Sequence, residues 1–254
     1  MDHGVIQAIY HYPVKGLSAQ PLAPVALKAG AAIGCDRAFA LEAGTGKFDP
    51  AVPKHMPKIN FLMLMRDERL ASLDSHFDAE TTTLTLSRDG ATLVSASLAT
   101  PEGRAAVERC IADDLGETLR GRPRLVAAPG HSFSDVPMKC LHIINLASVR
   151  ALEAELGRPL DPMRFRANII IDGLEPWGEF AWVNRTIAIS GARADVLLRT
   201  ERCAATNVDP GTAMRSGDLP GDLMRAYGHA DFGIYAKVTD EGEADIGDVV
   251  ALAA

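Results

Sequence analysis

The pairing of Arg202 with Cys203 is the strongest chemical signal in the sequence. The two residues end the run from Arg199 to Cys203, and Asp209 follows six positions later. A neighbouring guanidinium favours the thiolate over the thiol, and the thiolate is the form that attacks electrophiles and binds soft metals. The alternative is a small, buried, apolar cysteine at the end of a strand. Cys203 is therefore a candidate nucleophile or metal ligand.

Basic residues that could bind an anion occur at three further places. In the run from Arg164 to Asn168, Arg164 and Arg166 would project to the same face of an extended segment, where paired guanidinium groups bind phosphate or carboxylate. Lys15 and Arg37 each lie beside a turn and could supply further contacts. The alternative for all of them is a solvated surface charge.

Other polar residues give weaker signals. Asp135 and Asp209 lie nearest to the basic and thiol motifs, although each also fits an Asx turn. The seven histidines form no H-E-x-x-H motif and do not indicate a metal site. No cysteine lies in a C-x-x-C, and the sequence has neither a G-x-S-x-G motif nor a G-x-G-x-x-G or Walker loop.

Short apolar runs separated by Gly, Pro or Asp predict that mainly β-strands position these residues. The predicted strands cover residues 5–12, 25–27, 38–42, 61–65, 83–86, 92–95, 143–146, 169–171, 186–189, 194–199, 233–238 and 249–252. Helices are predicted over 101–115, 147–156 and 222–227, and residues 67–77 are predicted as a short helix or an irregular segment. The predicted fold class is mainly β with peripheral helices (α+β).

Length and charge limit the classes of protein that remain. The 254 residues suit one or two domains, and Gly and Pro near residues 121–131 predict a boundary between domains 1–125 and 126–254. A net charge of −7 without a basic stripe argues against nucleic acid. The longest apolar stretch, residues 61–65, is too short to cross a membrane, and the first residues lack a secretory signal. We therefore expect a cytoplasmic protein with free thiols.

The order of the motifs carries more information than any one of them. In chain order they are Tyr12-Pro13-Val14-Lys15, Cys35-Asp36-Arg37, Phe133-Ser134-Asp135, Arg164-Phe165-Arg166-x-Asn168, Arg202-Cys203-x-x-Thr206-x-Val208-Asp209, Phe232-Gly233-Ile234-Tyr235 and Ile246-Gly247-Asp248. This order resembles the MOSC family, named for the C-terminal domain of molybdenum cofactor sulfurase, preceded by that family's N-terminal β-barrel-like domain. The family includes the mitochondrial amidoxime-reducing component and its bacterial relatives.

The resemblance implies a C-terminal MOSC β-barrel that holds molybdenum cofactor (molybdopterin) against the N-terminal domain. Cys203 would be the protein ligand of molybdenum, and Asp209 would take part in proton transfer. The cofactor-binding residues implied by the resemblance are Lys15, Arg37, Ser134, Asp135, Arg166, Asn168, Arg202 and Thr206. Pyridoxal phosphate binding is also associated with the family.

Departures from the family pattern concern the substrate more than the cofactor. Gly16 stands where many relatives have serine, Ala167 stands where the family has proline, and residues 49–55 replace a Gln-Arg stretch. No ferredoxin-like segment follows Asp248. The resemblance thus implies an oxidoreductase that reduces small N-hydroxylated compounds with electrons from a separate protein.

Two other functions are compatible with the same residues. One is a sulfur-transfer or cofactor-carrier protein in which Cys203 bears a persulfide or holds the cofactor for delivery. The other is a non-catalytic barrel in which Cys203 is buried and the arginines are surface charges.

Overall fold

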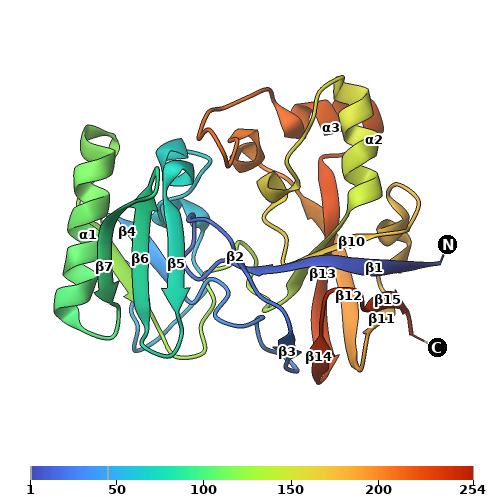
Figure 1. Ribbon diagram of the computed structural model, residues 1–254, viewed down its shortest axis with the longest axis horizontal. Helices are drawn as coiled ribbons and strands as arrows, with labels where there is room; N and C mark the ends of the chain where they lie inside the picture. The colour runs from blue at the N-terminus through green and yellow to red at the C-terminus, as the bar shows by residue number, and fades with distance from the viewer. Residues whose placement is uncertain (1, 45, 254) are drawn as a thin grey trace.

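The first strand of the chain completes a barrel whose other strands come from the C-terminal half. A computed structural model describes residues 2–44 and 46–253. In it, β1 (His3–His11) pairs antiparallel with both β10 (Ile169–Asp172) and β15 (Val249–Leu252). The ring continues from β10 through β9 (Leu141–Asn145), β13 (Asp231–Asp240), β12 (Ala192–Glu201) and β11 (Thr186–Ile189) to β15. Seven strands therefore close the barrel (Figure 1).

Alternating side chains of one strand fill the barrel and cover its outside. Ile169 and Ile171 belong to the interior core, whereas Ile170 packs in a separate core with residues of α2 (Leu146–Leu156) and α3 (Leu219–Tyr227). A strand buried on both faces needs a continuous apolar run, which explains three consecutive isoleucines. Gly233 of β13 has a φ of +80°, and a Cβ there would lie 2.5 Å from the Ile143 carbonyl oxygen. This close approach of β13 to β9 requires glycine.

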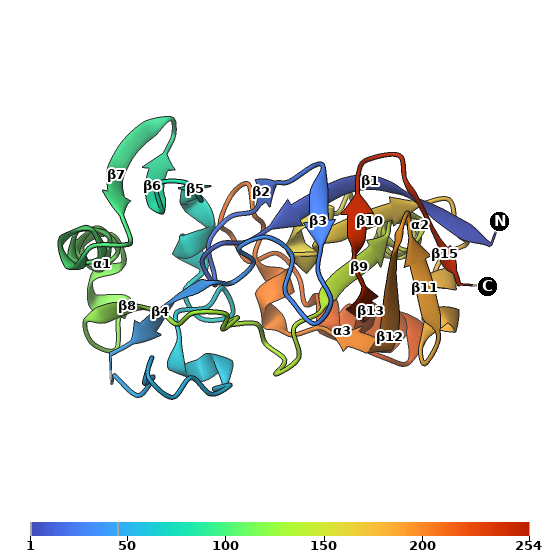
Figure 2. The same ribbon diagram turned by 90° about the horizontal axis from the view of Figure 1, so that it is seen from below.

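The N-terminal part of the chain has its own hydrophobic core. A three-stranded antiparallel sheet of β5 (Asp74–Asp78), β6 (Thr83–Arg88) and β7 (Ala91–Ser97) packs against α1 (Pro101–Leu115), and β4 (Phe39–Ala43) pairs with β8 (Pro123–Ala127). Helix α1 begins where the Thr100 hydroxyl accepts a hydrogen bond from the Gly103 amide (3.1 Å), and it ends at Gly116. In Figure 2 this part lies at one end of the molecule and the barrel at the other.

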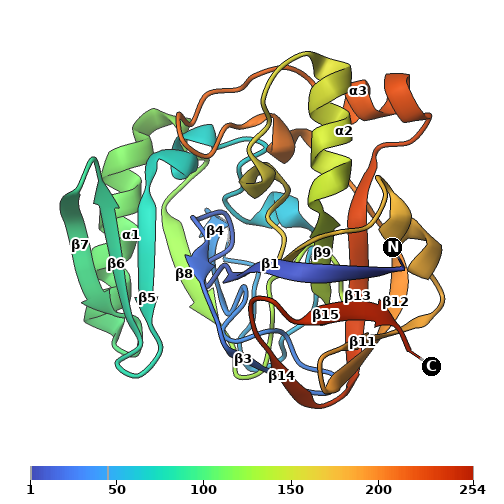
Figure 3. The ribbon, with the colours of Figure 1, turned by 45° about the vertical axis from the view of Figure 1, so that its right-hand side comes forward.

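Two short strands follow β1 in the chain and pair with other strands. β2 (Gln20–Pro21) pairs with the end of β1, and β3 (Val25–Leu27) pairs with β14 (Gly242–Ala244). Figure 3 shows α2 and α3 on the outside of the barrel. The 3₁₀ helices are η1 (Lys58–Asn60), η2 (Glu68–Ser72), η3 (Gly116–Thr118), η4 (Pro162–Phe165), η5 (Gly178–Trp182) and η6 (Ala204–Asn207).

The predicted fold class is confirmed, and one predicted strand is wrong. Residues 61–65 form no strand: Phe61 makes a single bridge to Glu42, and the chain then turns. The buried Asp67 carboxylate accepts a hydrogen bond from the Met63 amide (3.1 Å), and the Asp67 amide donates back to the Met63 carbonyl oxygen (2.9 Å). This reciprocal pair closes the backbone into a turn despite the apolar side chains.

Two other predictions have different outcomes. The predicted domain boundary near residue 125 stays a prediction. Among residues 2–44 and 46–253, none of the helices has both the length and the apolar composition needed to span a bilayer.

Candidate functional site

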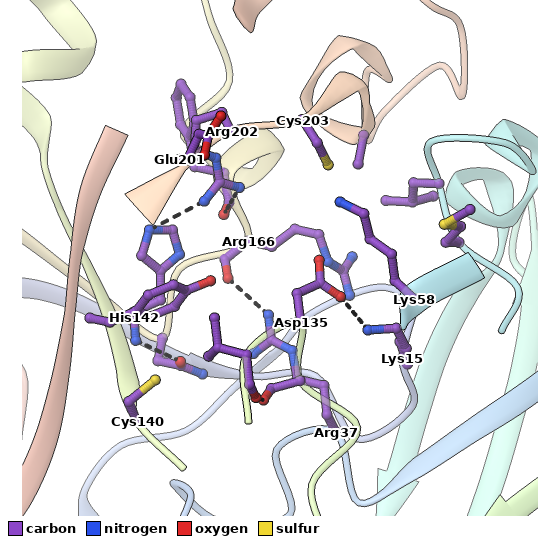
Figure 4. A pocket seen from close by; sticks show the side chains of 18 of the residues that line it. Lys15, Arg37, Lys58, Asp135, Cys140, His142, Arg166, Glu201, Arg202 and Cys203 are labelled. Atoms are coloured by element: carbon purple, nitrogen blue, oxygen red, sulfur yellow. Dashed lines mark hydrogen bonds and ion pairs between the residues drawn. The ribbon is translucent and has the colours of Figure 1, made fainter. Parts of the chain in front are cut away.

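A cavity of about 700 Å³ opens between the barrel and the N-terminal part of the chain. Its walls come from the turn after β1, from residues 58–65, and from the segments that flank β9, β10 and β12 (Figure 4). Seven cationic side chains and four carboxylates line it, although the whole chain carries a net charge of −7. The cavity therefore concentrates positive charge, which favours an anionic ligand.

Cys203 lies at the start of η6, immediately after β12, and lines the cavity. Its backbone is held by Thr206, whose amide and hydroxyl both donate to the Cys203 carbonyl oxygen, at 3.0 and 2.9 Å. The ammonium group of Lys58 points towards the Cys203 sulfur from the N-terminal side of the cavity (Figure 4). Burial opposes the charge on Lys58, but a hydrogen bond with Cys203 and the thiolate charge raise the pKa of Lys58 above its usual value.

Lys15 and Asp135 form an ion pair that joins the two walls. The buried Lys15 ammonium donates to the Asp135 carboxylate and to the Phe133 carbonyl oxygen (2.8 Å). Burial lowers the pKa of Lys15, and Asp135 opposes that shift. Burial would raise the pKa of Asp135, but the charge and hydrogen bond of Lys15 outweigh it and hold that pKa at about 2. Asp135 is therefore a carboxylate at neutral pH.

Two guanidinium groups lie over the ring of Tyr12. The Cζ atoms of Arg37 and Arg166 are 4.4 and 4.2 Å from the ring centroid, and both arginines have positive φ values, 49° and 54°. Arg37 donates to both Asp36 carboxylate oxygens, at 2.6 and 2.7 Å, and to the Arg166 carbonyl oxygen, at 3.2 Å. Burial lowers the pKa of Arg166 to about 10, and its Nη2 finds no acceptor among the described residues. A buried donor of this kind fits a ligand oxygen.

Arg202, which precedes Cys203 in the sequence, is fixed by contacts with Phe165 and His142. Its Nη2 donates to the Phe165 carbonyl oxygen (2.8 Å), and its Nη1 lies 3.5 Å from His142 Nε2. Its Nε has no acceptor in the part of the chain that the structure describes. Burial, and then the charge of Arg202, lower the pKa of His142 well below its usual value. His142 is therefore a neutral imidazole at physiological pH.

The structure brings most of the predicted site residues to one cavity. Its walls include Lys15, Arg37, Ser134, Asp135, Arg166, Asn168, Arg202 and Cys203. Asn168, however, uses its side-chain amide to pin strands, accepting from the His142 amide (3.0 Å) and donating to the Tyr10 carbonyl oxygen (3.2 Å). The roles assigned to these residues from the resemblance stay predictions.

Thr206 and Asp209 do not line the cavity. Thr206 is fully buried behind Cys203, which it holds. One oxygen of Asp209 accepts from Arg164 Nη2 (2.5 Å), and the other accepts from the amides of Gly211 and Thr212, at 3.0 and 2.9 Å. The structure thus places Asp209 at the base of a loop, and its predicted part in proton transfer stays a prediction.

The expectation that Arg164 and Arg166 share one face of an extended segment is wrong. Arg164 lies in η4, and Arg166 adopts the left-handed conformation at its end. Their guanidinium groups therefore separate: that of Arg164 donates to the carbonyl oxygens of Thr206 and Asn207, whereas that of Arg166 lies over Tyr12.

Sequence reasoning gave no role to Lys58 and His142, which line the cavity, and Tyr235 entered it only as part of the motif Phe232-Gly233-Ile234-Tyr235. His142 and Tyr235 lie on adjacent paired strands, with ring centroids 5.3 Å apart, and for His142 the apolar run around it was the signal that could have placed it. Lys58 follows the residues that replace the family's Gln-Arg stretch. Nothing in its local pattern distinguishes it from the solvated Lys54.

A thiol and clustered cations line the cavity at the mouth of a closed barrel, and one protein-family model matches the half of the chain that supplies most of this barrel. Residues 130–251 match the MOSC domain model. The match covers 122 of the 254 residues, so the second half of this chain is similar to that domain family. The comparisons give no support to pyridoxal phosphate as a ligand.

Similar proteins include two named for amidoxime reduction. Human mitochondrial amidoxime-reducing component 1 is 27% identical over 122 residues, covering 43% of this chain and 36% of that protein. Rat mitochondrial amidoxime reducing component 2 is 28% identical over 122 residues, with the same coverage. The matches thus span about a third of the length of these relatives.

Solved structures were also found at low similarity. YiiM from Geobacillus stearothermophilus has a TM-score of 0.36 and 19% identity, covering 45% of this chain and 54% of that chain. The YUAD protein from Bacillus subtilis has a TM-score of 0.45 and 12% identity, covering 98% of this chain and 94% of that chain.

Proposed function

We propose that this chain is an oxidoreductase that binds molybdenum cofactor and reduces N-hydroxylated compounds, with electrons from a separate redox protein. The observation that carries the proposal is the arrangement around Cys203, where a cavity-facing thiol shares one space with an excess of cations. The relatives named for amidoxime reduction support the reaction class. The MOSC domain supports the choice of cofactor.

The donors of the cavity fit a phosphorylated, sulfur-rich cofactor. Arg166 Nη2 and Arg202 Nε are buried without an acceptor among the described residues, so a bound anion would complete their hydrogen bonds. Soft thiolates prefer thiophilic metals, and guanidinium forks prefer phosphate. The cavity volume of about 700 Å³ also lies within the range of small-molecule sites.

Each residue would then have a definite task. Cys203 would be the protein ligand of the metal, and Thr206 would fix its backbone. Lys15, Arg37, Arg166 and Arg202 would hold the phosphate and the pterin, while Ser134, Asp135 and Asn168 would supply or orient polar contacts. When bound, the cofactor supplies two-electron chemistry at molybdenum. Reduction of N–OH to N–H also consumes two protons and releases water, so protons must enter the cavity from solvent and water must leave it.

The first prediction is that Cys203 determines metal content. Protein from molybdate-fed cells should contain molybdenum close to one atom per chain, and Cys203→Ser should lower this by roughly tenfold or more, because it removes the thiolate. Metal analysis measures the content, and benzamidoxime reduction with an artificial electron donor measures the activity. Cys110→Ser, on α1 and away from the cavity, is the matched control.

Two outcomes would contradict the proposal. A molybdenum content of no more than a few per cent of the wild-type chains would show that the protein does not hold the cofactor. Metal binding with stoichiometric transfer to an acceptor, but without steady-state turnover, would instead support the carrier function in which Cys203 holds the cofactor or a persulfide for delivery.

A further inference from the structure

Lys58 brings a positive charge from the N-terminal part of the chain to the reactive sulfur of the barrel. It lies outside the matched domain, yet its side chain points towards Cys203 (Figure 4). No ion pair joins it to a carboxylate in the described residues, unlike Lys15, which binds Asp135. The ammonium group of Lys58 therefore faces Cys203 and the cavity instead of a paired carboxylate.

The backbone of Lys58 is fixed by the fold. Residues 58–60 form η1, in which the Phe61 amide donates to the Lys58 carbonyl oxygen (3.0 Å), and Phe61 is 2% exposed. Arg120 Nη2 also donates to the Ile59 carbonyl oxygen (3.0 Å). These contacts anchor η1 to a hydrophobic core, so Lys58 is presented to the cavity from a defined position.

The carboxylates that line the cavity form no ion pair with Lys58 in the part of the chain that the structure describes. Two of the four cavity carboxylates are already engaged, since Asp36 binds Arg37 and Asp135 binds Lys15. Asp231 lies 4.0 Å from Arg199 Nη1. Glu201 is exposed. An oxygen with negative charge that approaches Cys203 would therefore meet the Lys58 ammonium, on which the charges of Cys203 and of the already paired Asp135 also act.

We propose that Lys58 is a specificity-determining residue that binds the oxygen-bearing end of the substrate. It would favour N-oxygenated compounds whose oxygen carries negative charge, such as N-oxides and ionised hydroxamates, over cationic N-hydroxyguanidines. This inference rests on the proposed function, because the substrate must approach the group bound at Cys203. The physical basis is attraction of an oxygen anion or dipole by an ammonium in a partly desolvated cavity.

The first experiment measures the charge preference around Cys203 without the cofactor. The full chain, purified from cells grown without molybdate, is alkylated with neutral iodoacetamide or with anionic iodoacetate, and mass spectrometry follows the Cys203 peptide. Both reagents attack the same thiolate, so the ratio of their rates reports attraction of the anion and cancels the ionised fraction of the thiol. Lys58→Met should lower the iodoacetate-to-iodoacetamide ratio by about fivefold.

Two further variants make this experiment decisive. Lys58→Arg keeps the charge and should keep the ratio. Lys54→Met removes a solvated lysine of the same segment that does not line the cavity, and it should also keep the ratio. An unchanged ratio in Lys58→Met, or an equal fall in Lys54→Met, overturns the proposal.

The second experiment uses the cofactor-loaded enzyme. Lys58→Met should raise KM for an ionised hydroxamate by about fivefold while leaving KM for a cationic N-hydroxyguanidine unchanged or lower. Equal changes for both substrates overturn the assigned specificity. If the wild-type enzyme turns over neither compound, the proposed function fails, and the alkylation ratio still decides whether Lys58 attracts anions to Cys203.

Discussion

Glu179 is a carboxylic acid that the fold buries with no ion pair to a cation among residues 2–44 and 46–253. It is fully buried, and its carboxylate accepts hydrogen bonds from Ser148 Oγ (3.2 Å) and Asn145 Nδ2 (3.3 Å). Burial raises the pKa of Glu179 to about 7. The folded protein therefore prefers the protonated acid, whereas the unfolded chain ionises near the ordinary value of 4.5.

We predict that Glu179 makes the protein less stable as pH rises. Its stabilising contribution is complete below the unfolded pKa and is lost as pH rises through about 7, because the unfolded state then binds fewer protons than the folded state. Glu179→Gln should remove roughly 2–3 kcal/mol of this dependence between pH 5 and pH 8. Urea unfolding across that range measures it, with the exposed Glu175→Gln as control. An unaltered pH slope in Glu179→Gln would contradict the argument.

One loop of the barrel half binds the N-terminal part of the chain through Arg215. Arg215, in the loop that follows η6, donates to the Met65 carbonyl oxygen (2.8 Å) and to the Glu68 carboxylate (2.9 Å). Asp209 and Arg164 hold the base of this loop. The loop therefore fixes the turn at Leu64 and Met65, which lines the cavity opposite Cys203.

Removing the Arg215 contacts should destabilise both of the segments that they join. Arg215→Ala should increase amide hydrogen exchange in residues 62–68 and 209–216 by roughly fivefold, because a partly exposed ion pair with added carbonyl contacts contributes about 1 kcal/mol. Exchange followed by mass spectrometry measures the change. Arg150→Ala, which breaks the exposed pair with Asp172 away from the cavity, should leave both segments unchanged. Equal exchange in the two variants would show that the Arg215 contacts do not stabilise these two segments.

Elements with a clear repeat or cap were predictable, and those shaped by a single polar contact were not. Helix α1 follows from Pro101 and Gly116 at its ends, and β10 follows from three consecutive isoleucines. Residues 61–65 have the composition of a strand, but the Asp67 carboxylate turns the backbone. Likewise, Arg164 and Arg166 diverge because a 3₁₀ helix replaces extended backbone.

The candidate site was predictable to the extent that motif order carried it. Lys15, Arg37, Arg166, Arg202 and Cys203 are far apart in the sequence, yet they line one cavity. Motif spacing could not predict which way a side chain turns, so it did not show that Thr206 holds the Cys203 backbone from outside the cavity or that Asp209 pairs with Arg164. Lys58 gave no signal, because its position depends on how the N-terminal part packs against the barrel.

At the scale of the whole molecule, Tyr12 links the two parts. It is 1% exposed, its amide donates to the Asp36 carboxylate (2.9 Å), and its hydroxyl donates to the Ala167 carbonyl oxygen (3.3 Å). The guanidinium groups of Arg37 and Arg166 both rest on its ring. A single aromatic side chain thus bridges the N-terminal segment and the barrel beneath the cavity.

Truncating this side chain should weaken the coupling between the parts. Tyr12→Ala should lower the free energy of unfolding by about 3–5 kcal/mol, the range for loss of a buried aromatic ring, and should separate calorimetric unfolding into two transitions. Tyr12→Phe keeps the ring and loses only the hydroxyl contact, so it should cost about 1 kcal/mol and keep one transition. A single transition in Tyr12→Ala would mean that other contacts couple the parts.

The position of β1 has a consequence for how the protein is made. This strand is synthesised well before its partners β10 and β15, which come from the later half of the described chain. Until then only the end of β1 can pair, with β2, so most of its apolar side chains and backbone groups lack a partner strand, which exposes the nascent chain to aggregation. The barrel, and with it the mouth of the cavity, can assemble only after β15 has been translated. A ligand that needs the complete cavity can therefore bind only after β15 has joined the barrel.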